Sequence, residues 1–460
     1  MEVGEKIYSS KSGITYTIFY PFKAGGQAEV AYATSSHSNH VFFIKRLLNI
    51  KYSKHKHIQK ECERFETTRN EIYKKINSMT LDGATCPYVH DFFREGSFYY
   101  VVSRKIDGFS FSASDISKYL TLDEKLFLCR TIAYSLYPLE KQGIIHGDIK
   151  PDNFILKKKD KCFISNMVDL ESSFLLNNPP AKGYIIGTEP YYSPELVDYN
   201  DEDNLVDKNV LSAKSDVFSL GVVFYELLTG TYPKISGKEV YAFEAVKHGE
   251  KIPIPETWPK ALRTLILSML DKKPSNRPTI MEILQSLKSI KIDTKPISGI
   301  HSPYVVVSPT ADGKAEVSLY SLQLNSEIVY SLDGGPCILY EHPFIISDDD
   351  LVLKIKVSLK DNPHEIKEFT HEVSASINKR GKVARPVVKI NRGSIQISSS
   401  TSGVEIYYTL NVDEPTKKAN RYRSPFSVPE NTVIKVVAYK KGMHSSDVVS
   451  INSSSKIKIS

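Results

Sequence analysis

Short apolar and β-branched runs alternate with polar turns over the first hundred residues of the chain. Residues 14–20 and 41–45 are β-rich runs typical of strands, with a third short run and a glycine pair between them. Residues 61–78 have helical character, and residues 98–106 (FYYVVSRKI) form a longer apolar strand. This part of the sequence predicts a strand, loop, strand, turn and strand, followed by a helix and a further strand.

Helical spacing dominates the middle of the chain. Residues 121–124 (TLDE) form a capping box, and apolar residues then recur at helical spacing until Gly143 ends the helix. Pro138, in the last turns, predicts a kink or an early end of this helix. Three more elements are expected: a hairpin over 154–164, a helix from 215 that is apolar on nearly all sides and therefore buried, and helices from 261 to 290.

The composition changes at a Ser-, Pro- and Lys-rich stretch near residues 291–303, after which Val, Ile, Ser, Thr and Tyr dominate. Two segments beyond this boundary repeat each other, because residues 327–332 (EIVYSL) resemble residues 405–410 (EIYYTL). Short alternating strands in two units of about 80 residues indicate two β-sandwich modules in tandem.

Composition and charge narrow the class of protein. The 460 residues, 41% of them hydrophobic, are enough for two to four domains with cores of their own. The net charge of +7 is spread over interspersed charges, which argues against a dedicated nucleic-acid surface.

The cysteines and the N-terminus bear on the compartment. Five widely spaced cysteines without a CxxC pair indicate neither a disulfide framework nor a zinc site. The N-terminus lacks the apolar core of a secretory signal, and no run approaches the ~18 apolar residues of a membrane span. We therefore expect a cytoplasmic protein with no membrane span.

The polar loop at residues 146–153 (HGDIKPDN) carries the candidate chemistry. It follows the apolar Ile144-Ile145 strand and places Asp148, Lys150 and Asn153 at fixed offsets. With this loop the chain, over about residues 12–290, resembles the eukaryotic-type protein kinases. The resemblance implies an α+β bilobal protein-kinase fold, with Asp148 accepting the proton of a substrate hydroxyl and Lys150 neutralising charge on the transferred phosphoryl group.

The resemblance also implies an ATP site in the N-terminal part. Lys45, in Phe43-Ile44-Lys45, matches the strand lysine that contacts the α and β phosphates, and its partner is expected to be Glu71, with Glu66 as the alternative. Cofactor-binding positions expected by the same match are Gly25, Gly26, Ala28 and Val30 in the glycine-rich loop, and Ser103, Arg104 and Ile106 in the connection between lobes.

Asn153 and Asp169 are the metal ligands that the resemblance implies, for Mg²⁺ or Mn²⁺ held with ATP. The family's Asp-Phe-Gly is here Asp169-Leu170-Glu171, in which Leu170 can replace the phenylalanine as a hydrophobic plug. Glu171 removes the glycine whose freedom lets this segment flip, which predicts a loop fixed in one conformation or a reduced rate.

Residues 187–195 (GTEPYYSPE) match the end of the kinase activation segment. Glu195 is expected to pair with Arg277 as a structural ion pair, and Asp216 to brace the backbone of the catalytic loop. Thr188 contacts the catalytic aspartate and lysine in the family. Gly147 stands where most members carry an arginine that holds a phosphorylated activation loop, which predicts activity independent of such phosphorylation.

The second β-unit resembles the fibronectin-like C-terminal domain of chitobiase and β-hexosaminidase. Three domains are expected: a kinase domain at 12–295, divided into a smaller lobe at 12–107 and a larger lobe at 108–295, then fibronectin- or immunoglobulin-like β-sandwich modules at 300–378 and 383–460. The modules are expected to fold independently and to bind a partner protein.

The functional reading is a serine/threonine protein kinase that phosphorylates protein substrates, because Lys150 stands two residues after the catalytic aspartate as in Ser/Thr-specific members. One alternative is a pseudokinase or nucleotide-binding scaffold, which the atypical glycine-rich loop and Glu171 favour. Another is a carbohydrate or envelope binder with an accessory kinase domain. The tail contains no tryptophan, which argues against this alternative because sugar sites usually present flat aromatic side chains.

Overall fold

The computed structural model describes most of the chain. The described residues are 1–22, 28–79, 86–159, 162–235, 240–290, 299–348, 351–375, 383–391, 394–401, 403–411, 413, 415–417, 419–429, 431–440 and 445–453. Gly25 and Gly26, on which the glycine-rich loop was predicted, lie outside these residues.

Two compact units make up the chain, and each contains part of the helical region and one β-module. The first unit comprises residues 1–146, 151–180 and 280–377, and the second comprises 147–150, 181–279 and 378–460. The domain boundaries expected from the sequence are not resolved by this division and stay predictions.

A six-stranded antiparallel sheet with the strand order β1-β2-β3-β4-β6-β5 begins the first unit. Its strands are β1 (Lys6–Tyr8), β2 (Thr15–Pro21), β3 (Ala28–Ser35), β4 (Ser38–Leu47), β5 (Val89–Glu95) and β6 (Phe98–Arg104). Strand β2 corresponds to the run predicted at 14–20, and its residues alternate strictly between half-buried and buried. Strands β1 and β5 were not predicted.

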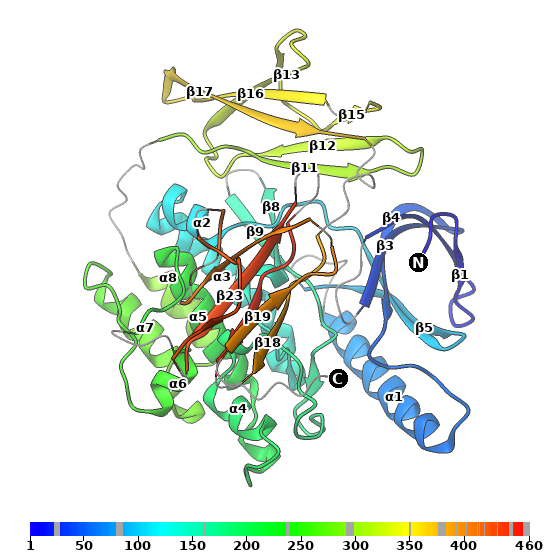
Figure 1. The fold of residues 1–460 in the computed structure, drawn as a ribbon, viewed down its shortest axis with the longest axis vertical. Coiled ribbons are helices and arrows are strands. Elements are labelled where there is room, and N and C mark those ends of the chain that lie inside the picture. Colours follow the sequence, from blue (N-terminus) through cyan, green and yellow to red (C-terminus); the bar gives the residue numbers. More distant parts are fainter. Residues whose placement is uncertain are drawn as a thin grey trace. The chain divides into compact units, whose positions relative to one another are not determined.

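Helix α1 (Lys56–Met79) lies beside this sheet (Figure 1). Aromatic side chains make the contact between them. The rings of Phe65 and Tyr73 each meet the ring of Phe92 on β5, at centroid distances of 6.0 and 5.3 Å. The residues of α1 that are buried, Cys62, Ile72, Tyr73 and Ile76, follow the helical repeat. One face of α1 is therefore fixed toward the sheet.

Helix α3 (Leu122–Gln142) carries the chain to the catalytic loop. Its capping box is confirmed, because the Glu124 N–H donates to Thr121 Oγ1 at 3.3 Å and the Thr121 N–H donates to Glu124 Oε2 at 2.7 Å. The predicted early end at Pro138 is wrong, since the helix continues to Gly143, whose φ of 64° caps it. Pro138 is buried within α3 and removes one backbone donor from the helix.

The remaining elements before the tail in this unit are short. They are α2 (Ala113–Tyr119), β7 (Ile144–Ile145), the 3-10 turn η1 (Pro151–Asn153), β8 (Phe154–Lys159), β9 (Cys162–Met167), β10 (Phe174–Leu175) and α8 (Ile280–Ser289). Strands β8 and β9 form the predicted hairpin.

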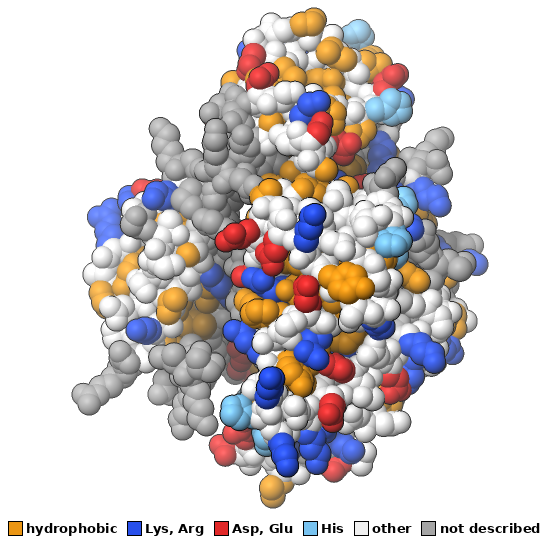
Figure 2. Space-filling model, turned by 90° about the vertical axis from the view of Figure 1, so that its right-hand side faces the viewer, with side chains coloured by type: hydrophobic (Ala, Val, Ile, Leu, Met, Phe, Trp, Pro, Cys, Tyr) orange, Lys and Arg blue, Asp and Glu red, His pale blue; other side chains and the backbone are white. Residues whose placement is uncertain are grey.

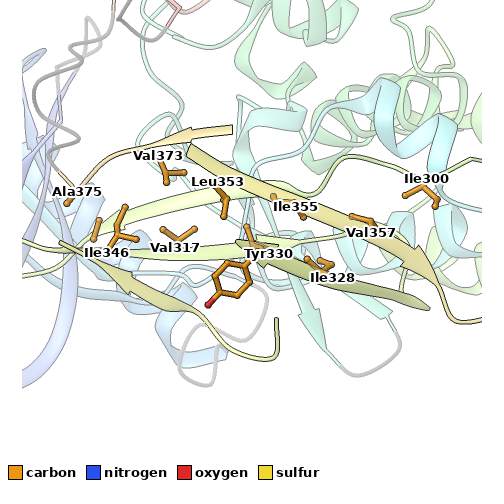
Figure 3. Close-up of a cluster of buried hydrophobic side chains, with 12 residues drawn as sticks. Ile300, Val317, Ile328, Tyr330, Ile346, Leu353, Ile355, Val357, Val373 and Ala375 are labelled. Carbon is orange, nitrogen blue, oxygen red and sulfur yellow. The ribbon is translucent and has the colours of Figure 1, made fainter. Parts of the chain in front are cut away.

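Module 1, the β-region of the first unit, is built from two facing antiparallel sheets. One has the order β11-β12-β15 and the other β14-β13-β16-β17. The strands are β11 (Tyr304–Pro309), β12 (Ala315–Tyr320), β13 (Ser326–Leu332), β14 (Ile338–Leu339), β15 (Phe344–Ile346), β16 (Leu351–Leu359) and β17 (Asn362–Val373). Figure 3 shows their apolar side chains, among them Val317, Ile328 and Ile355, gathered between the two sheets.

Module 1 packs against the segment that follows β6. The ring of Phe109 stacks on the rings of Tyr304 and Tyr320, each at a centroid distance of 4.8 Å, and only 2% of Phe109 is exposed. The Tyr304 hydroxyl donates to Asp115 Oδ2 of α2 at 2.7 Å and accepts from the Ser112 N–H at 3.2 Å. Independent folding of the tail stays a prediction, but module 1 covers an apolar residue of the kinase-like part.

The helices of the second unit surround a central buried helix. They are α4 (Pro194–Asn200), α5 (Ala213–Thr229), α6 (Ala242–Lys247) and α7 (Lys260–Met269), with the 3-10 turns η2 (Glu189–Tyr191), η3 (Lys208–Val210) and η4 (Pro274–Asn276). Nearly every residue of α5 from Ser215 to Leu228 is buried, as its apolar pattern predicted.

The predicted ion pair between Glu195 and Arg277 is confirmed in this unit. Arg277 donates through Nη1 and Nη2 to the two carboxylate oxygens of Glu195, at 2.6 and 2.8 Å. Arg277 is 2% exposed and Glu195 6%. Ser215 of α5 also donates its hydroxyl to Glu195, at 2.7 Å. The pair therefore ties the start of α4 to α5 and to η4.

Module 2, the β-region of the second unit, has the same strand orders as module 1. Its sheets run β18-β19-β22 and β21-β20-β23-β24. The strands are β18 (Val387–Asn391), β19 (Ser394–Ser398), β20 (Glu405–Thr409), β21 (Asn420–Arg421), β22 (Phe426–Ser427), β23 (Val433–Tyr439) and β24 (Val449–Asn452).

The sequence repeat corresponds to a repeated packing contact. In module 1 Tyr330 stacks on Phe344 at 4.2 Å, and in module 2 Tyr408 stacks on Phe426 at 4.4 Å. These tyrosines occupy equivalent positions of the two repeated strands. An α+β kinase-like region followed by paired antiparallel sheets confirms the expected fold class.

Acidic and basic side chains are interspersed on the face that Figure 2 shows. None of the helices in the described ranges combines the length and the apolar character that crossing a membrane requires.

Replacing Tyr304 tests the contact between module 1 and the segment that follows β6. Tyr304→Phe removes two hydrogen bonds, worth about 1–2 kcal/mol together, and Tyr304→Ala also removes the stack on Phe109. We expect amide hydrogen exchange in α2 to become faster in the order wild type, Phe, Ala. Equal exchange in all three proteins would contradict the role of this contact.

Replacing Arg277 tests the buried ion pair. Arg277→Met leaves the Glu195 carboxylate buried without its counter-charge and should destabilise the fold by about 3–5 kcal/mol, measured by urea unfolding. Adding Glu195→Gln should recover part of this loss, because it removes the uncompensated charge. A loss below about 1 kcal/mol in the single variant would show that the pair is not a major anchor.

Candidate functional site

Lys45 is the central cation among the predicted site residues of the first unit. It lies on β4, opposite Val30 of β3 and Val101 of β6. Its ammonium contacts Glu171 Oε2 at 2.6 Å and Asp169 Oδ1 at 3.1 Å, and its side chain is 15% exposed. The neighbouring strands thus hold Lys45 at the segment predicted to bind metal.

The expected pair between Lys45 and Glu71 does not form. Glu71 pairs with Lys75 one helical turn further along α1, at 2.9 Å, and its side chain is 47% exposed. The alternative, Glu66, accepts a hydrogen bond from the Tyr99 hydroxyl at 2.7 Å. The physical reason is the rotation of α1, whose buried face is set by Ile72, Tyr73 and Ile76 and leaves Glu71 toward solvent.

The Asp169-Leu170-Glu171 segment is held from several sides. Asp169 has a left-handed backbone, with φ of 68°, and its Oδ1 accepts from the Glu171 N–H at 3.3 Å. Arg69 of α1 donates to the Leu170 carbonyl at 3.0 Å and to Ser173 Oγ at 3.3 Å. Leu170 is 3% exposed, which agrees with its expected role as a hydrophobic plug.

Asn153 is the other predicted metal ligand of this unit. It ends η1, is 4% exposed, and its carbonyl accepts from the Val168 N–H at 2.8 Å, which ties the catalytic loop to the segment before Asp169. No group of three or more His, Cys, Asp or Glu side chains suited to a metal occurs in the described part. A carboxylate with an amide oxygen is nevertheless the donor chemistry that suits Mg²⁺ completed by phosphates.

The connection after β6 carries the residues predicted to meet the base. Ser103 pairs across the sheet with Phe43 and Val89, and Arg104 is the last residue of the strand. Ile106 follows as a half-buried residue. Ala28 and Val30, which were expected in the glycine-rich loop, lie instead on β3, because the strand already begins at Ala28. Contacts of these residues with a nucleotide stay predictions.

The second unit carries the catalytic-loop residues Asp148 and Lys150. The Lys150 ammonium lies 3.0 Å from Asp148 Oδ2 and donates to Thr188 Oγ1 at 2.7 Å. Asp148 is 12% exposed in its side chain. The family's contact between Thr188 and the loop lysine is therefore present in this chain.

Two glycines let the loop and the activation segment approach closely. Gly147 has φ of 75°, which disfavours a side chain, and its N–H donates to Asp216 Oδ1 at 3.0 Å, so the expected bracing by Asp216 is confirmed. A Cβ on Gly187 would lie 2.6 Å from the Gly147 carbonyl oxygen and 2.7 Å from the Tyr192 ring.

Burial raises the pKa of two side chains around this loop. Burial, and then the negative charge of Asp148, raises the pKa of the Tyr192 hydroxyl well above its usual value. Burial likewise raises the pKa of Glu189, with a smaller contribution from Glu244. Tyr192 is therefore a neutral phenol beside Asp148 at neutral pH.

Sequence reasoning missed two features of the site. Glu171 was noted as a departure from the family but not as the partner of Lys45, and Arg69 was not singled out at all. The helical repeat carried a signal for Arg69, because it precedes Tyr73 by four residues and so lies on the buried face of α1.

Comparison with known proteins agrees with this architecture. Residues 389–450 match the chitobiase/β-hexosaminidase C-terminal domain. A candidate serine/threonine-protein kinase of Acanthamoeba polyphaga mimivirus is 31% identical over 196 residues, which cover 40% of this chain and 63% of that protein. Calcium-dependent protein kinase 27 of Arabidopsis thaliana is 26% identical over 192 residues, covering 40% of this chain and 37% of its own.

A third relative differs in activity. The inactive serine/threonine-protein kinase PLK5 of Mus musculus is 27% identical over 205 residues, covering 43% of this chain and 32% of its own. The chain thus spans less than two thirds of the length of each of these relatives. Residues 23–287, more than half of the chain, match the protein kinase domain, and the chain belongs to the protein kinase family.

Proposed function

We propose that this protein is an active serine/threonine protein kinase that transfers the γ-phosphate of ATP to hydroxyl groups of proteins. The observation that carries the proposal is the contact chain from Asp148 through Lys150 to Thr188. Asp148 accepts the proton of the attacking hydroxyl, and Lys150 offsets charge on the transferred group. Such positioning and charge stabilisation supply most of the rate in phosphoryl transfer.

Asp169 and Asn153 would hold a divalent metal, Mg²⁺ or Mn²⁺, together with the phosphates of ATP. When bound, the metal neutralises phosphate charge. Lys45 supplies a fixed positive charge for the α and β phosphates, and the segment after β6 supplies backbone groups for the base.

A nucleotide-binding scaffold without transfer is the second candidate. The position of Glu71, which pairs with Lys75 at 2.9 Å, favours it, because active kinases need the pair between the strand lysine and the helix glutamate in place. The mouse relative PLK5 is inactive according to its name. Nucleotide binding and phosphate transfer must therefore be distinguished in this chain as well.

For the two modules we propose recognition of a partner protein. Each has a buried core of its own between two sheets, and we find no cluster of metal-ligating side chains among their described residues. We also propose a cytoplasmic location, because all five cysteines are free and Cys337 is exposed, which suits a reducing compartment.

Removing the proposed base or metal ligand tests the activity. Asp148→Asn and Asp169→Asn should each lower kcat by roughly 10² or more in transfer from labelled ATP to a serine/threonine peptide. Asp203→Asn, at an exposed position of the second unit, serves as the matched control. Equal labelling by all four proteins would overturn the proposal, and nucleotide binding without transfer in the wild type would select the scaffold.

Phosphatase treatment tests the consequence of Gly147. With no arginine there to pair with a phosphate, dephosphorylation of Ser172, Ser173, Tyr184 or Thr188 should change the initial rate on a peptide by less than about tenfold. Tyr184 is 71% exposed, so Tyr184→Phe is a suitable companion variant, whereas Ser173 is fully buried. A larger fall after treatment would show regulation by phosphorylation.

A further inference from the structure

We propose that Glu171 is the positioning residue for Lys45, in place of a carboxylate from helix α1. The inference rests on the proposed function in one respect, that Lys45 serves the phosphates of ATP. It assigns to Glu171 a positive role, where the family pattern has a glycine.

The first step concerns the face that α1 turns toward the Asp169-Leu170-Glu171 segment. Arg69 and Tyr73 lie four residues apart on one side of the helix, and Arg69 bonds the Leu170 carbonyl and Ser173 Oγ. Glu71 lies on another side with Lys75. The helix therefore presents a cation to this segment, while its two candidate carboxylates are engaged by other partners, Glu71 by Lys75 and Glu66 by the Tyr99 hydroxyl.

The second step is the geometry of the pair itself. Lys45 and Glu171 have side chains that are 15% and 19% exposed, and their charged atoms lie 2.6 Å apart. A charge-assisted hydrogen bond between largely buried groups holds its partners more firmly than a surface ion pair does. Asp169, at 3.1 Å and 42% exposed, is the weaker partner of Lys45.

The third step concerns what remains when a metal binds. Asp169 is the proposed metal ligand, so its carboxylate cannot serve as the permanent counter-charge of Lys45. Glu171 carries no such second task and keeps Lys45 oriented. The left-handed backbone position in this segment belongs to Asp169, not to Glu171, so a side chain at position 171 costs no backbone strain.

A consequence for regulation follows. Lys45 and Glu171 are tied through β4 and the metal-binding segment, without a side chain from α1. Arg69 of α1 nevertheless holds the Leu170 carbonyl at 3.0 Å, so a displacement of α1 would reach the pair through the backbone of this segment and not through a carboxylate of the helix.

Amine labelling provides a test that needs no nucleotide. The full chain and its Glu171→Gln, Glu171→Asp and Glu71→Gln variants are treated with an amine-reactive ester, and the labelling of Lys45 and Lys75 is followed by mass spectrometry. A lysine held in an ion pair presents its nitrogen to the reagent less often. We expect Glu171→Gln to speed labelling of Lys45 at least about threefold and to leave Lys75 unchanged. Glu71→Gln should speed labelling of Lys75 and leave Lys45 unchanged.

Kinetics on the same variants supply the functional readout. Glu171→Gln should lower kcat/KM for ATP about tenfold or more, Glu171→Asp should restore most of it, and Glu71→Gln should cost less than a fifth of the Glu171→Gln effect. Thermal midpoints within about 3 °C of the wild type separate positioning from misfolding.

Two results would overturn the inference. One is unchanged labelling of Lys45 in Glu171→Gln, and the other is faster labelling of Lys45 in Glu71→Gln. If the wild type transfers no phosphate, the proposed kinase activity fails, while the labelling pattern still decides whether Glu171 holds Lys45.

Discussion

Charged side chains that leave water need a counter-charge at hydrogen-bond distance, and the architecture around the site depends on this constraint. Arg277 meets it with Glu195, Lys45 with Glu171 and Asp169, and Lys150 with Asp148. Each pair joins segments that are distant in sequence or fixes a loop. The same contacts therefore stabilise the fold and orient the groups that we assign to phosphoryl transfer.

Each unit combines family features with one substitution that changes a charged contact. At position 147 a glycine stands in place of the arginine that would bind a phosphate, and the left-handed backbone there suits glycine. Glu171 supplies to Lys45 the carboxylate that α1 does not offer. The first substitution leaves no arginine to pair with a phosphate in the second unit, and the second places a counter-charge for Lys45 in the segment after Asp169 of the first unit.

The two β-modules repeat one design with different neighbours. Each pairs a three-stranded and a four-stranded sheet, and each has a tyrosine stacked on a phenylalanine within its core. Module 1 adds Tyr304 and Tyr320, which enclose Phe109. In module 2 an exposed ion pair joins Asp413 to Lys234, at 2.8 Å, within the second unit. Buried aromatic stacking stabilises a contact more than an exposed ion pair does. The contact of module 1 with Phe109 is therefore the more stable of the two.

The sequence by itself determined the features that depend on local order and period. The spacing of Asp148 and Asn153, the capped start of α3 and the repeated strands of the tail are all encoded within short windows. The pairing of Glu195 with Arg277 could also be predicted, because the matching kinase motifs name both partners.

Only the tertiary structure decided which carboxylate reaches Lys45. Glu171 lies 126 residues away along the chain, and its approach depends on the rotation of α1 and on the path of the segment after Asp169. Likewise, nothing in the sequence near Phe109 indicates that Tyr304 and Tyr320 cover it. Local periodicity specifies which face of an element is buried, whereas the partner on that face follows from how distant elements pack together.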